Sequence, residues 1–462
     1  MSSAQGSTQK FDRGAPRTNG SRETAHAPAR AYVVVPDSAA AGAPAGAPAQ
    51  RGVEGRLDEA VGLARAIDLE VVGQGVARIQ RPRPATLIGK GKVEEIAALV
   101  RAEAVDVVVV DQPLSPAQQR NLERAWQAKV LDRTGLILEI FGERARTREG
   151  RLQVELAHLN WQKSRLVRSW THLERQRGGY GFLGGPGETQ IEADRRLIQE
   201  RIVRIERELD SVRRTRGLHR ESRRRVPYPI VALVGYTNAG KSTLFNRLTQ
   251  SRVAAEDLLF ATLDPTLRGV ELPQGGTAIV SDTVGFISDL PTHLVAAFRA
   301  TLEEVMEAEI ILHVRDIAHA ETAEQAADVS EILHSLEVDA ADRRRVVEVW
   351  NKLDLLDAES RQEVTNRIVR MAADERPVLL SAATGEGVDD LVAAIDDRLK
   401  GDRAARHVTL DPADGGALNW LYERCHVAER HDDAETGRIA LEVLVPPQRL
   451  TEFERRFGSA TR

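Results

Sequence analysis

The chain alternates between short apolar runs, which are typical of buried strands, and longer segments in which apolar residues recur every three or four positions, as in amphipathic helices. Within residues 55–141, helical spacing occurs at 58–67 and 92–101, and the apolar run at 107–110 is continuous. Residues 115–126 begin with Ser-Pro, which is a favourable helix N-cap followed by proline at the first helical position. This alternation predicts a small α/β domain with a parallel sheet.

The next part of the chain contains two long, charged segments with helical periodicity, at residues 152–175 and 189–216. The run 178–187 between them is rich in glycine and also contains Tyr180 and Phe182. Flexible linkers are typically Gly/Ser-rich and lack large aromatic side chains. We therefore predict two helices joined by a glycine-rich tip, which together form a helical arm.

Arginine is abundant along this arm, and its pattern has two interpretations. The guanidinium groups neutralise RNA phosphates, or they form a solvated helix face that glutamates balance. The arginines are Arg165, Arg168, Arg175, Arg177, Arg195 and Arg196, and the glutamates are Glu155, Glu174, Glu192 and Glu200. The residues alone leave both interpretations open.

Strand and helix patterns alternate again between residues 229 and 400, and the last segment, 406–457, contains a predicted helix at 417–429 and a predicted strand at 439–445. These patterns divide the chain into five parts. We predict a disordered tail at 1–50, an N-terminal α/β domain at 51–142, the helical arm at 143–226, a larger α/β domain at 227–401 and a small α+β domain at 402–462. The run at 31–35, inside the tail, is strand-like and is a candidate first strand of the N-terminal domain.

Composition narrows the class of protein. Hydrophobic residues make up 42% and charged residues 29% of the 462 residues, which suits a soluble protein with buried cores. No apolar run is long enough to span a membrane, and the N-terminus lacks the apolar region of a secretory signal. The single cysteine, Cys425, excludes an intrachain disulfide and a multi-cysteine metal site. These features predict a cytoplasmic protein.

A phosphate-binding loop follows the apolar strand at 229–234. Residues 235–242 have the pattern GxxxxGK[ST] ahead of a helical sequence, as a P-loop requires. Lys241 is predicted to reach the β- and γ-phosphates, and Ser242 to offer its hydroxyl to Mg²⁺. Backbone N–H groups and the helix N-terminus complete the site. The predicted nucleotide-binding residues here are Gly235, Tyr236, Thr237, Asn238, Ala239, Gly240, Lys241 and Ser242.

Two short sequences behind this loop predict that the base is guanine. Asn-Lys-Leu-Asp at 351–354 follows a strand, and the Asp354 carboxylate can accept both the N1–H and the 2-amino group of guanine, a pair of donors that adenine lacks. Ser-Ala-Ala at 381–383 follows another strand, where a backbone N–H can meet guanine O6. The predicted base contacts are Asn351, Lys352, Asp354, Ser381, Ala382 and Ala383. We therefore predict GTP and GDP as ligands.

The segments between these sequences are candidate switches. Asp282 is predicted to hold Mg²⁺ through water, Gly285 to reach the γ-phosphate with its N–H, and Thr262 to be the second Mg²⁺ hydroxyl. Both segments are predicted to order with GTP and relax after hydrolysis. The predicted switch residues are Phe260, Ala261, Thr262, Leu263, Asp264, Asp282, Thr283, Val284 and Gly285. The predicted catalytic residues are Lys241, Thr262, Asp282 and Gly285. The fold class that follows is α/β, with a P-loop GTPase domain of mostly parallel strands and helices on both faces.

One position departs from the pattern of many small GTPases. Phe286 stands where a glutamine usually orients the attacking water, so intrinsic hydrolysis is predicted to be slow unless another group positions that water. The loop also resembles the GxPNxGKS type, whose asparagine binds K⁺ near the phosphates. Asn238 matches that asparagine, although Thr237 replaces the proline. Stimulation by K⁺ is therefore a hypothesis for this chain.

Taken together, these sequences resemble the HflX family of ribosome-associated GTPases. The resemblance rests on the P-loop at 235–242, on Phe-Ala-Thr-Leu-Asp at 260–264 and on Asp-Thr-Val-Gly-Phe at 282–286. It extends to the arm tip at 178–190 and to Leu-Ile-Gly-Lys-Gly-Lys at 87–92, and it covers residues 55 to 400. Arg315 departs from the family pattern, which usually has an apolar residue there.

The resemblance implies a cytoplasmic, monomeric translation factor. HflX proteins bind the 50S ribosomal subunit and can split 70S ribosomes, notably those stalled by heat or antibiotics. Their arm reaches toward the peptidyl transferase centre of the 23S rRNA. In this chain, Tyr180 and Phe182 at the tip would then stack on unpaired bases.

Two alternatives stay open beside ribosome splitting. The first is a GTP-gated factor for 50S assembly or anti-association, which would use the same residues. The second is an ATP-dependent RNA helicase, because some family members bind ATP through the N-terminal domain. For residues 87–92, contact with rRNA phosphates or a plain βα turn is the interpretation that we favour over an ATP site.

Overall fold

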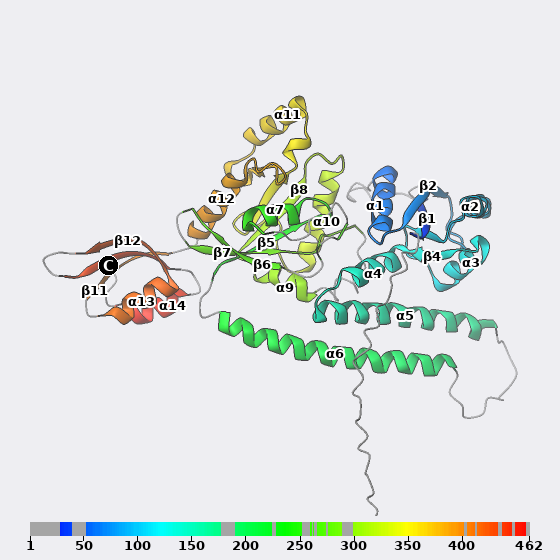
Figure 1. The fold of residues 1–462 in the computed structure, drawn as a ribbon, viewed down its shortest axis with the longest axis horizontal. Helices are drawn as coiled ribbons and strands as arrows, with labels where there is room; N and C mark the ends of the chain where they lie inside the picture. The colour runs from blue at the N-terminus through cyan, green and yellow to red at the C-terminus, as the bar shows by residue number, and fades with distance from the viewer. Residues whose placement is uncertain are drawn as a thin grey trace, which may run out of the picture.

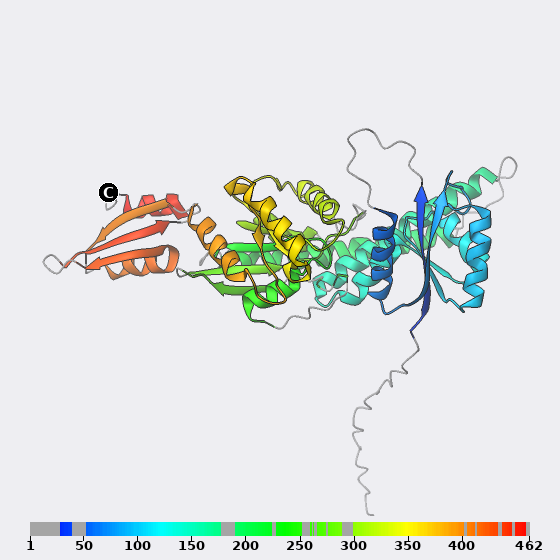
Figure 2. The same ribbon diagram turned by 90° about the horizontal axis from the view of Figure 1, so that it is seen from above.

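A computed structural model describes residues 28–38, 52–176, 190–223, 228–251, 259–260, 262, 266–273, 276–288, 299–401, 404–411, 414–432, 437–445 and 449–458. The predicted arm tip, with Tyr180 and Phe182, and the first 27 residues lie outside these ranges. Figures 1 and 2 show an N-terminal unit (28–144), a central unit (228–401) and a C-terminal unit (404–458) in a row. The arm (148–223) runs along the first two units.

The N-terminal unit has a four-stranded parallel sheet in the order β2-β1-β3-β4. Its elements are β1 (Arg30–Ser38), α1 (Val53–Arg65), β2 (Glu70–Ile79), α2 (Lys90–Ala102), β3 (Val107–Val110), α3 (Pro116–Trp126), β4 (Lys129–Asp132) and α4 (Arg133–Arg144). Because β1 lies between two strands of this sheet, the predicted domain boundary at residue 51 is wrong. The strand-like run at 31–35 belongs to this unit.

Helices cover both faces of this sheet. Along β1, Val33 and Val35 face the cluster that contains α1 and α4, whereas Tyr32 and Val34 face α2 and α3. Ser115 caps α3, as the sequence predicts: its side chain accepts a hydrogen bond from the Gln118 N–H at 3.2 Å. The predicted small α/β fold is therefore confirmed.

Two antiparallel helices form the arm: α5 (Arg148–Gln176) and α6 (Gln190–Arg223). A small apolar cluster of Leu152, Ile205 and Leu209 packs the start of α5 against the middle of α6. Glu155 of α5 and Arg201 of α6 form an ion pair at 2.7 Å farther along. The two predicted helical segments, 152–175 and 189–216, are found as helices, but α5 begins earlier and α6 ends later than predicted.

The central unit has a six-stranded sheet in the order β10-β9-β8-β5-β7-β6, in which only the edge strand β6 is antiparallel. Its strands are β5 (Ile230–Gly235), β6 (Thr266–Glu271), β7 (Thr277–Asp282), β8 (Ile310–Asp316), β9 (Val346–Asn351) and β10 (Val378–Leu379). Its helices are α7 (Lys241–Thr249), α9 (Arg299–Glu307), α10 (Thr322–Ser335), α11 (Ala358–Val369) and α12 (Val388–Gly401), with short 3₁₀ turns η1 (Leu353–Leu355) and η2 (Ala373–Glu375). Helices pack on both faces of the sheet, which confirms the predicted fold class.

The C-terminal unit is an antiparallel sheet in the order β11-β13-β12, with two helices packed on it. Its elements are β11 (Ala404–Leu410), α13 (Gly415–Arg424), β12 (His426–Asp432), β13 (Ile439–Val445) and α14 (Leu450–Phe457). The predicted strand at 439–445 is confirmed. The predicted helix at 417–429 is wrong beyond Arg424, because Cys425 is extended and the residues after it pair with β13.

One apolar cluster runs through both the N-terminal and the central unit. It contains residues of α4, such as Phe141, and also Tyr236, Phe260, Phe286 and Ile287 of the central unit. Tyr236 belongs to the P-loop and Phe260 to the first predicted switch segment, and Phe286 and Ile287 directly follow the second. The N-terminal unit therefore packs directly against the nucleotide-responsive part of the central unit.

Candidate nucleotide site

The P-loop lies between the buried strand β5 and helix α7, and two of its glycines are required by its geometry. Gly235 has φ +151°, and a Cβ there would lie 2.2 Å from the Val314 carbonyl oxygen. Gly240 has φ +87°, and a Cβ there would lie 2.3 Å from Asn351 Nδ2. L-residues with a side chain rarely adopt such φ values, so both positions favour glycine. The loop therefore has the compact turn that brings backbone N–H groups to the start of a helix.

Lys241 is buried at the first position of α7. Its ammonium group donates hydrogen bonds to the carbonyl oxygens of Gly235 at 3.1 Å and Tyr236 at 2.7 Å. Burial lowers the pKa of Lys241 to about 8, although nearby Asp282 favours the charged form. A phosphate oxygen beside this ammonium would oppose the effect of burial, as expected for a lysine that binds an anion.

The three predicted magnesium ligands meet at one point. Ser242 Oγ and Thr262 Oγ1 each donate to Asp282 Oδ2 at 2.8 Å, and the two hydroxyl oxygens lie 2.9 Å apart. Burial raises the pKa of the Asp282 carboxyl, whereas the hydrogen bonds from Ser242 and Thr262 lower it. One carboxylate and two hydroxyls, all oxygen donors, fit the set that P-loop enzymes present to Mg²⁺. The described residues contain no cluster of three or more His, Cys, Asp or Glu side chains suited to a metal.

Asn351 connects the P-loop to the loop at 381–383 at the base-binding end of the site. Its Nδ2 donates to the Ala239 carbonyl oxygen at 2.8 Å, and its Oδ1 accepts from the Ala382 N–H at 2.9 Å. The Ser381 hydroxyl donates to Asp354 Oδ1 at 2.5 Å, which holds that carboxylate in place. Because the Ala382 N–H is already bonded, Ala383 is the remaining alanine whose N–H is a candidate for guanine O6.

Lys352, the second residue of the predicted guanine sequence, has φ +67° and forms an ion pair with Asp316 at 2.8 Å. Asp316 ends β8, so this pair joins the two loops that follow β8 and β9. All six predicted base contacts are therefore brought to the same edge of the sheet, where the carboxyl ends of parallel strands meet.

The second switch segment is bonded to the P-loop through its backbone. The Phe286 N–H donates to the Gly235 carbonyl oxygen at 3.0 Å, and the Thr237 N–H donates to the Phe286 carbonyl oxygen at 2.8 Å. The Phe286 ring is buried in the cluster shared with the N-terminal unit. Of the first switch, Phe260 and Thr262 are described, whereas Ala261, Leu263 and Asp264 lie outside the described residues.

A buried ionic network that the sequence analysis missed joins this site to the N-terminal unit. Arg133 forms ion pairs with Asp111 and Glu59, each at 2.5 Å, and also donates to the Ser288 carbonyl oxygen at 2.8 Å. The Tyr236 hydroxyl donates to the other Glu59 oxygen and accepts from the Ser288 N–H at 2.9 Å. The network thus links the P-loop and the second switch to α1 and α4.

The charges of this network are almost fully removed from solvent, with side-chain exposures of 3–5% for Arg133, Glu59 and Asp111. Burial alone would lower the pKa of Arg133, but the two carboxylates outweigh it and raise the pKa, so the guanidinium stays charged. No local pattern reveals such a network, because Glu59 and Tyr236 are 177 residues apart in the sequence.

Two further contacts join the same units. Phe260 packs edge-on against Phe141, with ring centroids 4.8 Å apart. Glu321, just before α10, accepts a hydrogen bond from the Gly52 N–H at 2.9 Å at the start of α1. The carboxylate therefore lies where the helix dipole favours a negative charge.

The arm's arginines divide between the two interpretations of the sequence. Arg165 donates to Asp132 Oδ2 at 2.6 Å and its guanidinium lies 3.9 Å from the centre of the Trp161 ring, so it fastens the arm to the N-terminal unit. Arg196 is largely exposed and lies 3.8 Å from Glu200, while Arg195 is exposed. Among the described arginines, the exposed ones are the better candidates for contact with RNA phosphates.

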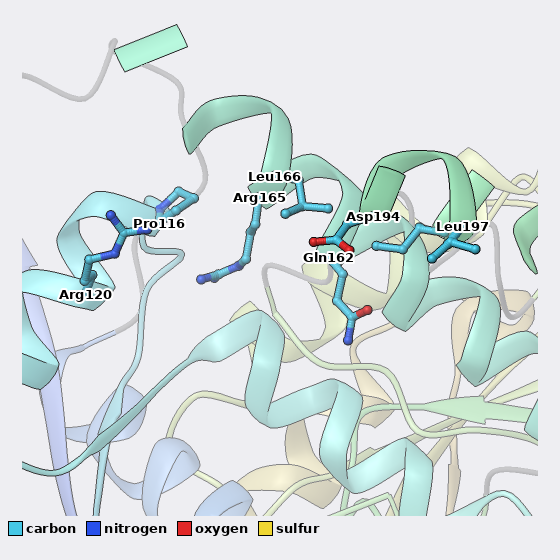
Figure 3. Close-up of a pocket in the computed structure, with 8 residues that line it drawn as sticks. Pro116, Arg120, Gln162, Arg165, Leu166, Asp194 and Leu197 are labelled. Carbon is cyan, nitrogen blue, oxygen red and sulfur yellow. The ribbon is translucent and has the colours of Figure 1, made fainter. Parts of the chain in front are cut away.

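Arg165 also borders a shallow cavity of about 570 Å³ between the N-terminal unit and the arm. Figure 3 shows it reaching from α5 toward α3, with Pro116 and Arg120 on one side and Leu197 of α6 on the other. None of the residues that line this cavity belongs to the nucleotide site. Within the described part of the chain, no helix is long and apolar enough to cross a membrane.

Comparison with known proteins matches each described unit of the chain to a family model. The family models that match are "GTP-binding GTPase N-terminal" at residues 54–142, "GTP-binding GTPase Middle Region" at 144–223, "50S ribosome-binding GTPase" at 230–352 and "HflX C-terminal domain" at 367–462. These matches together span most of the chain.

Individual relatives agree with the family models. A GTPase HflX of Magnetococcus marinus is 50% identical over 84% of this chain and 88% of the relative. A GTPase HflX of Escherichia coli is 46% identical over 84% of this chain and 89% of the relative. A crystal structure of a complex of SsGBP and GDP has a TM-score of 0.46 and 22% identity, and the match covers 80% of this chain and 98% of that one.

Proposed function

The chain belongs to the HflX family of GTP-hydrolysing enzymes, and from this premise we propose that it binds the 50S ribosomal subunit and splits 70S ribosomes in the cytoplasm. GTP favours the splitting conformation, and hydrolysis resets the factor. Support comes from the family description of residues 230–352 as a 50S ribosome-binding GTPase. The observation that carries the proposal is the arm: a long, arginine-rich hairpin inserted between the N-terminal unit and the nucleotide-binding unit.

The central unit's own residues account for recognition of GTP. Asp354 selects guanine, and Lys241 with the backbone N–H groups of the P-loop binds the phosphates. Ser242, Thr262 and Asp282 would hold Mg²⁺, which would neutralise phosphate charge when it is bound. The Gly285 N–H binds the γ-phosphate, so loss of that phosphate frees the second switch.

The shared cluster and the buried network suggest how a change at the switches reaches the rest of the molecule. Phe286 and Ser288, which directly follow the second switch, and Phe260 of the first switch all contact the N-terminal unit. That unit is in turn fastened to the arm by Arg165. A change in the switches therefore alters the surface on which the arm is mounted.

GTP hydrolysis should accelerate strongly when large ribosomal subunits are added in K⁺ and Mg²⁺ buffer. The reason is that Phe286 cannot orient the attacking water, so the ribosome is expected to complete the catalytic geometry. Steady-state phosphate release with and without purified 50S subunits measures this effect, and 30S subunits are the control. Unchanged hydrolysis at concentrations where 50S binding is demonstrated would contradict the proposed activation.

The assembly or anti-association alternative is distinguished by the fate of intact 70S ribosomes. Splitting predicts that GTP-loaded protein converts 70S particles into subunits, as measured by light scattering or sucrose gradients. An anti-association factor would keep free subunits apart but leave pre-formed 70S ribosomes intact. The same preparation of protein serves both assays.

An ATP-dependent activity of the N-terminal unit receives less support. Lys90 and Lys92, at the start of α2, form ion pairs with Glu94 at 3.6 Å and Glu95 at 2.7 Å on their own helix. Lysines paired in this way are less available to bind phosphates. Binding of labelled ATP that excess GTP does not displace would restore this alternative.

Potassium is expected to speed hydrolysis relative to sodium if Asn238 ligates it. Asn238 is exposed and has φ +59°, so its side chain is accessible beside the phosphate loop. The measurement is the hydrolysis rate in KCl and in NaCl at equal ionic strength, with Asn238→Ala as the matched variant. Equal rates in the two salts would contradict the hypothesis.

A further inference from the structure

Phe286 stands where a glutamine usually orients the attacking water, and in this structure it packs against the N-terminal unit instead. Its ring is 2% exposed and packs in the apolar cluster shared with the N-terminal unit. Its backbone pairs with the P-loop on both sides, through Gly235 and Thr237. The water-positioning role therefore falls to a different residue, or to an activator.

Thr237 lies at the γ-phosphate end of the site. A Cβ built on Gly285 would lie 2.9 Å from Thr237 Cγ2 and 3.1 Å from Lys241 Nζ. Thr237 and the phosphate-binding lysine therefore meet at the very residue whose N–H is predicted to bind the γ-phosphate. The Thr237 N–H is already bonded to the Phe286 carbonyl oxygen, so the donor that this residue can offer a ligand is its hydroxyl.

The Thr237 hydroxyl is buried and has no hydrogen-bond partner among the described residues. The whole residue is 6% exposed. A buried hydroxyl without a partner destabilises the folded protein, whereas valine has nearly the same shape and carries no such cost. The Thr237 hydroxyl is therefore best explained by a hydrogen-bond partner that enters the site together with the nucleotide.

The other hydroxyl and ammonium groups of the site already have hydrogen-bond partners, and the one unpartnered carboxylate oxygen in its described part, Asp282 Oδ1, belongs to the predicted magnesium site. Lys241 is bonded to two carbonyl oxygens, and the Ser242 and Thr262 hydroxyls are bonded to Asp282. Asn238 is exposed. Thr237 is thus the described residue that combines a position beside Gly285 with an unused buried hydroxyl.

We propose that the Thr237 hydroxyl positions the water that attacks the γ-phosphorus during GTP hydrolysis. It accepts a hydrogen bond from the water, which aims the water's lone pair at phosphorus. The water oxygen forms the new bond to phosphorus while the bond from phosphorus to the β–γ bridging oxygen breaks. The products are GDP and inorganic phosphate, one water proton remaining on phosphate and the other passing to solvent, and Thr237 keeps its own proton. This role rests on GTP hydrolysis alone and not on the proposed action on ribosomes.

The test compares Thr237→Val and Thr237→Ser in the full chain, in single-turnover hydrolysis without ribosomes. Valine keeps the shape and removes the hydroxyl, and serine keeps the hydroxyl. We expect the hydrolysis rate of Thr237→Val to fall about a hundredfold, as when one preorganised hydrogen-bonding group is removed from a transition state. Thr237→Ser should stay within about threefold of the unmodified protein. Thr365→Val, on an exposed turn of α11, is the control for the threonine-to-valine change.

Two binding measurements separate this role from a structural one. Affinity for fluorescent GDP should stay unchanged in Thr237→Val and the thermal midpoint should not fall, whereas affinity for GDP with aluminium fluoride, which mimics the transition state, should fall with the rate. The proposal is overturned if Thr237→Val hydrolyses at the normal rate, if Thr237→Ser is as slow as Thr237→Val, or if GDP affinity falls as much as the rate. None of these outcomes depends on whether the protein splits ribosomes.

Discussion

Replacing Asp354 with asparagine is expected to lower the affinity for GTP by about a thousandfold, because two hydrogen bonds to a charged acceptor are lost at about 1.5–3 kcal/mol each. The asparagine amide would instead donate to the 2-oxo group of xanthine. Asp354→Asn should therefore bind xanthosine triphosphate more tightly than the unmodified protein does. Competition binding against a fluorescent nucleotide measures both affinities.

Asp357→Asn is the matched control for this change. Asp357 lies three residues further along, where its carboxylate accepts the Ser360 N–H at 2.8 Å and caps α11. The same chemical change there should leave nucleotide selection as it was. If Asp354→Asn kept full affinity for GTP, the base would have to be recognised by other groups, and the assignment of guanine to this carboxylate would be wrong.

Replacing Arg133 with alanine should destabilise the protein by about 3–5 kcal/mol, since removing one member of a buried ionic network leaves charges without compensation. Glu59 and Asp111 would then lie unpaired within the contact between the N-terminal and central units. We expect the thermal midpoint to fall and the two units to unfold in separate steps. Differential scanning calorimetry measures both effects.

Two comparisons separate this effect from the loss of any arginine. Arg344 is exposed, so Arg344→Ala should change stability by no more than about 0.5 kcal/mol. Changing the whole network together, with Arg133→Met, Glu59→Gln and Asp111→Asn, should recover much of the lost stability, because no buried charge is then left alone. An Arg133→Ala protein as stable as Arg344→Ala would show that the network contributes little.

The nucleotide-site geometry was accessible from the sequence because its residues lie in short, ordered patterns after buried strands. The P-loop, Asp282 and the guanine sequence at 351–354 each follow a strand, and the carboxyl ends of parallel strands meet at one edge of a sheet. The P-loop sequence, the short sequence around Thr262 and Asp282 at a strand end together predicted that Ser242, Thr262 and Asp282 would act on one magnesium ion. Their roles toward nucleotide and metal stay predictions until a ligand-bound structure or the variants above test them.

The contact between the N-terminal and central units was not accessible in this way. Arg133 begins a helix after an apolar strand, and nothing in its neighbourhood indicates two carboxylate partners from distant segments. Likewise Phe260 reads as part of a switch sequence, although its ring packs against α4. Periodicity predicts which face of an element is buried but not which other unit covers it.

Arg165 of the arm shows the same limit of prediction from sequence. From sequence, Arg165 was one of several arginines spaced along a charged helix, whereas in the structure its guanidinium lies between Asp132 and Trp161. Charge patterning cannot separate an arginine that fastens two units from one that faces solvent, because both lie on the same helix and differ only in what lies opposite.

The length of α5 gives the arm mechanical leverage. Its 29 residues correspond to about 43 Å at 1.5 Å per residue. A tilt of about ten degrees at its base would therefore carry its far end through about 8 Å, whereas residues at the base would hardly move. The arm is the stretch of chain that connects the N-terminal unit to the P-loop strand. A rotation of one unit against the other would therefore also move the far ends of both arm helices.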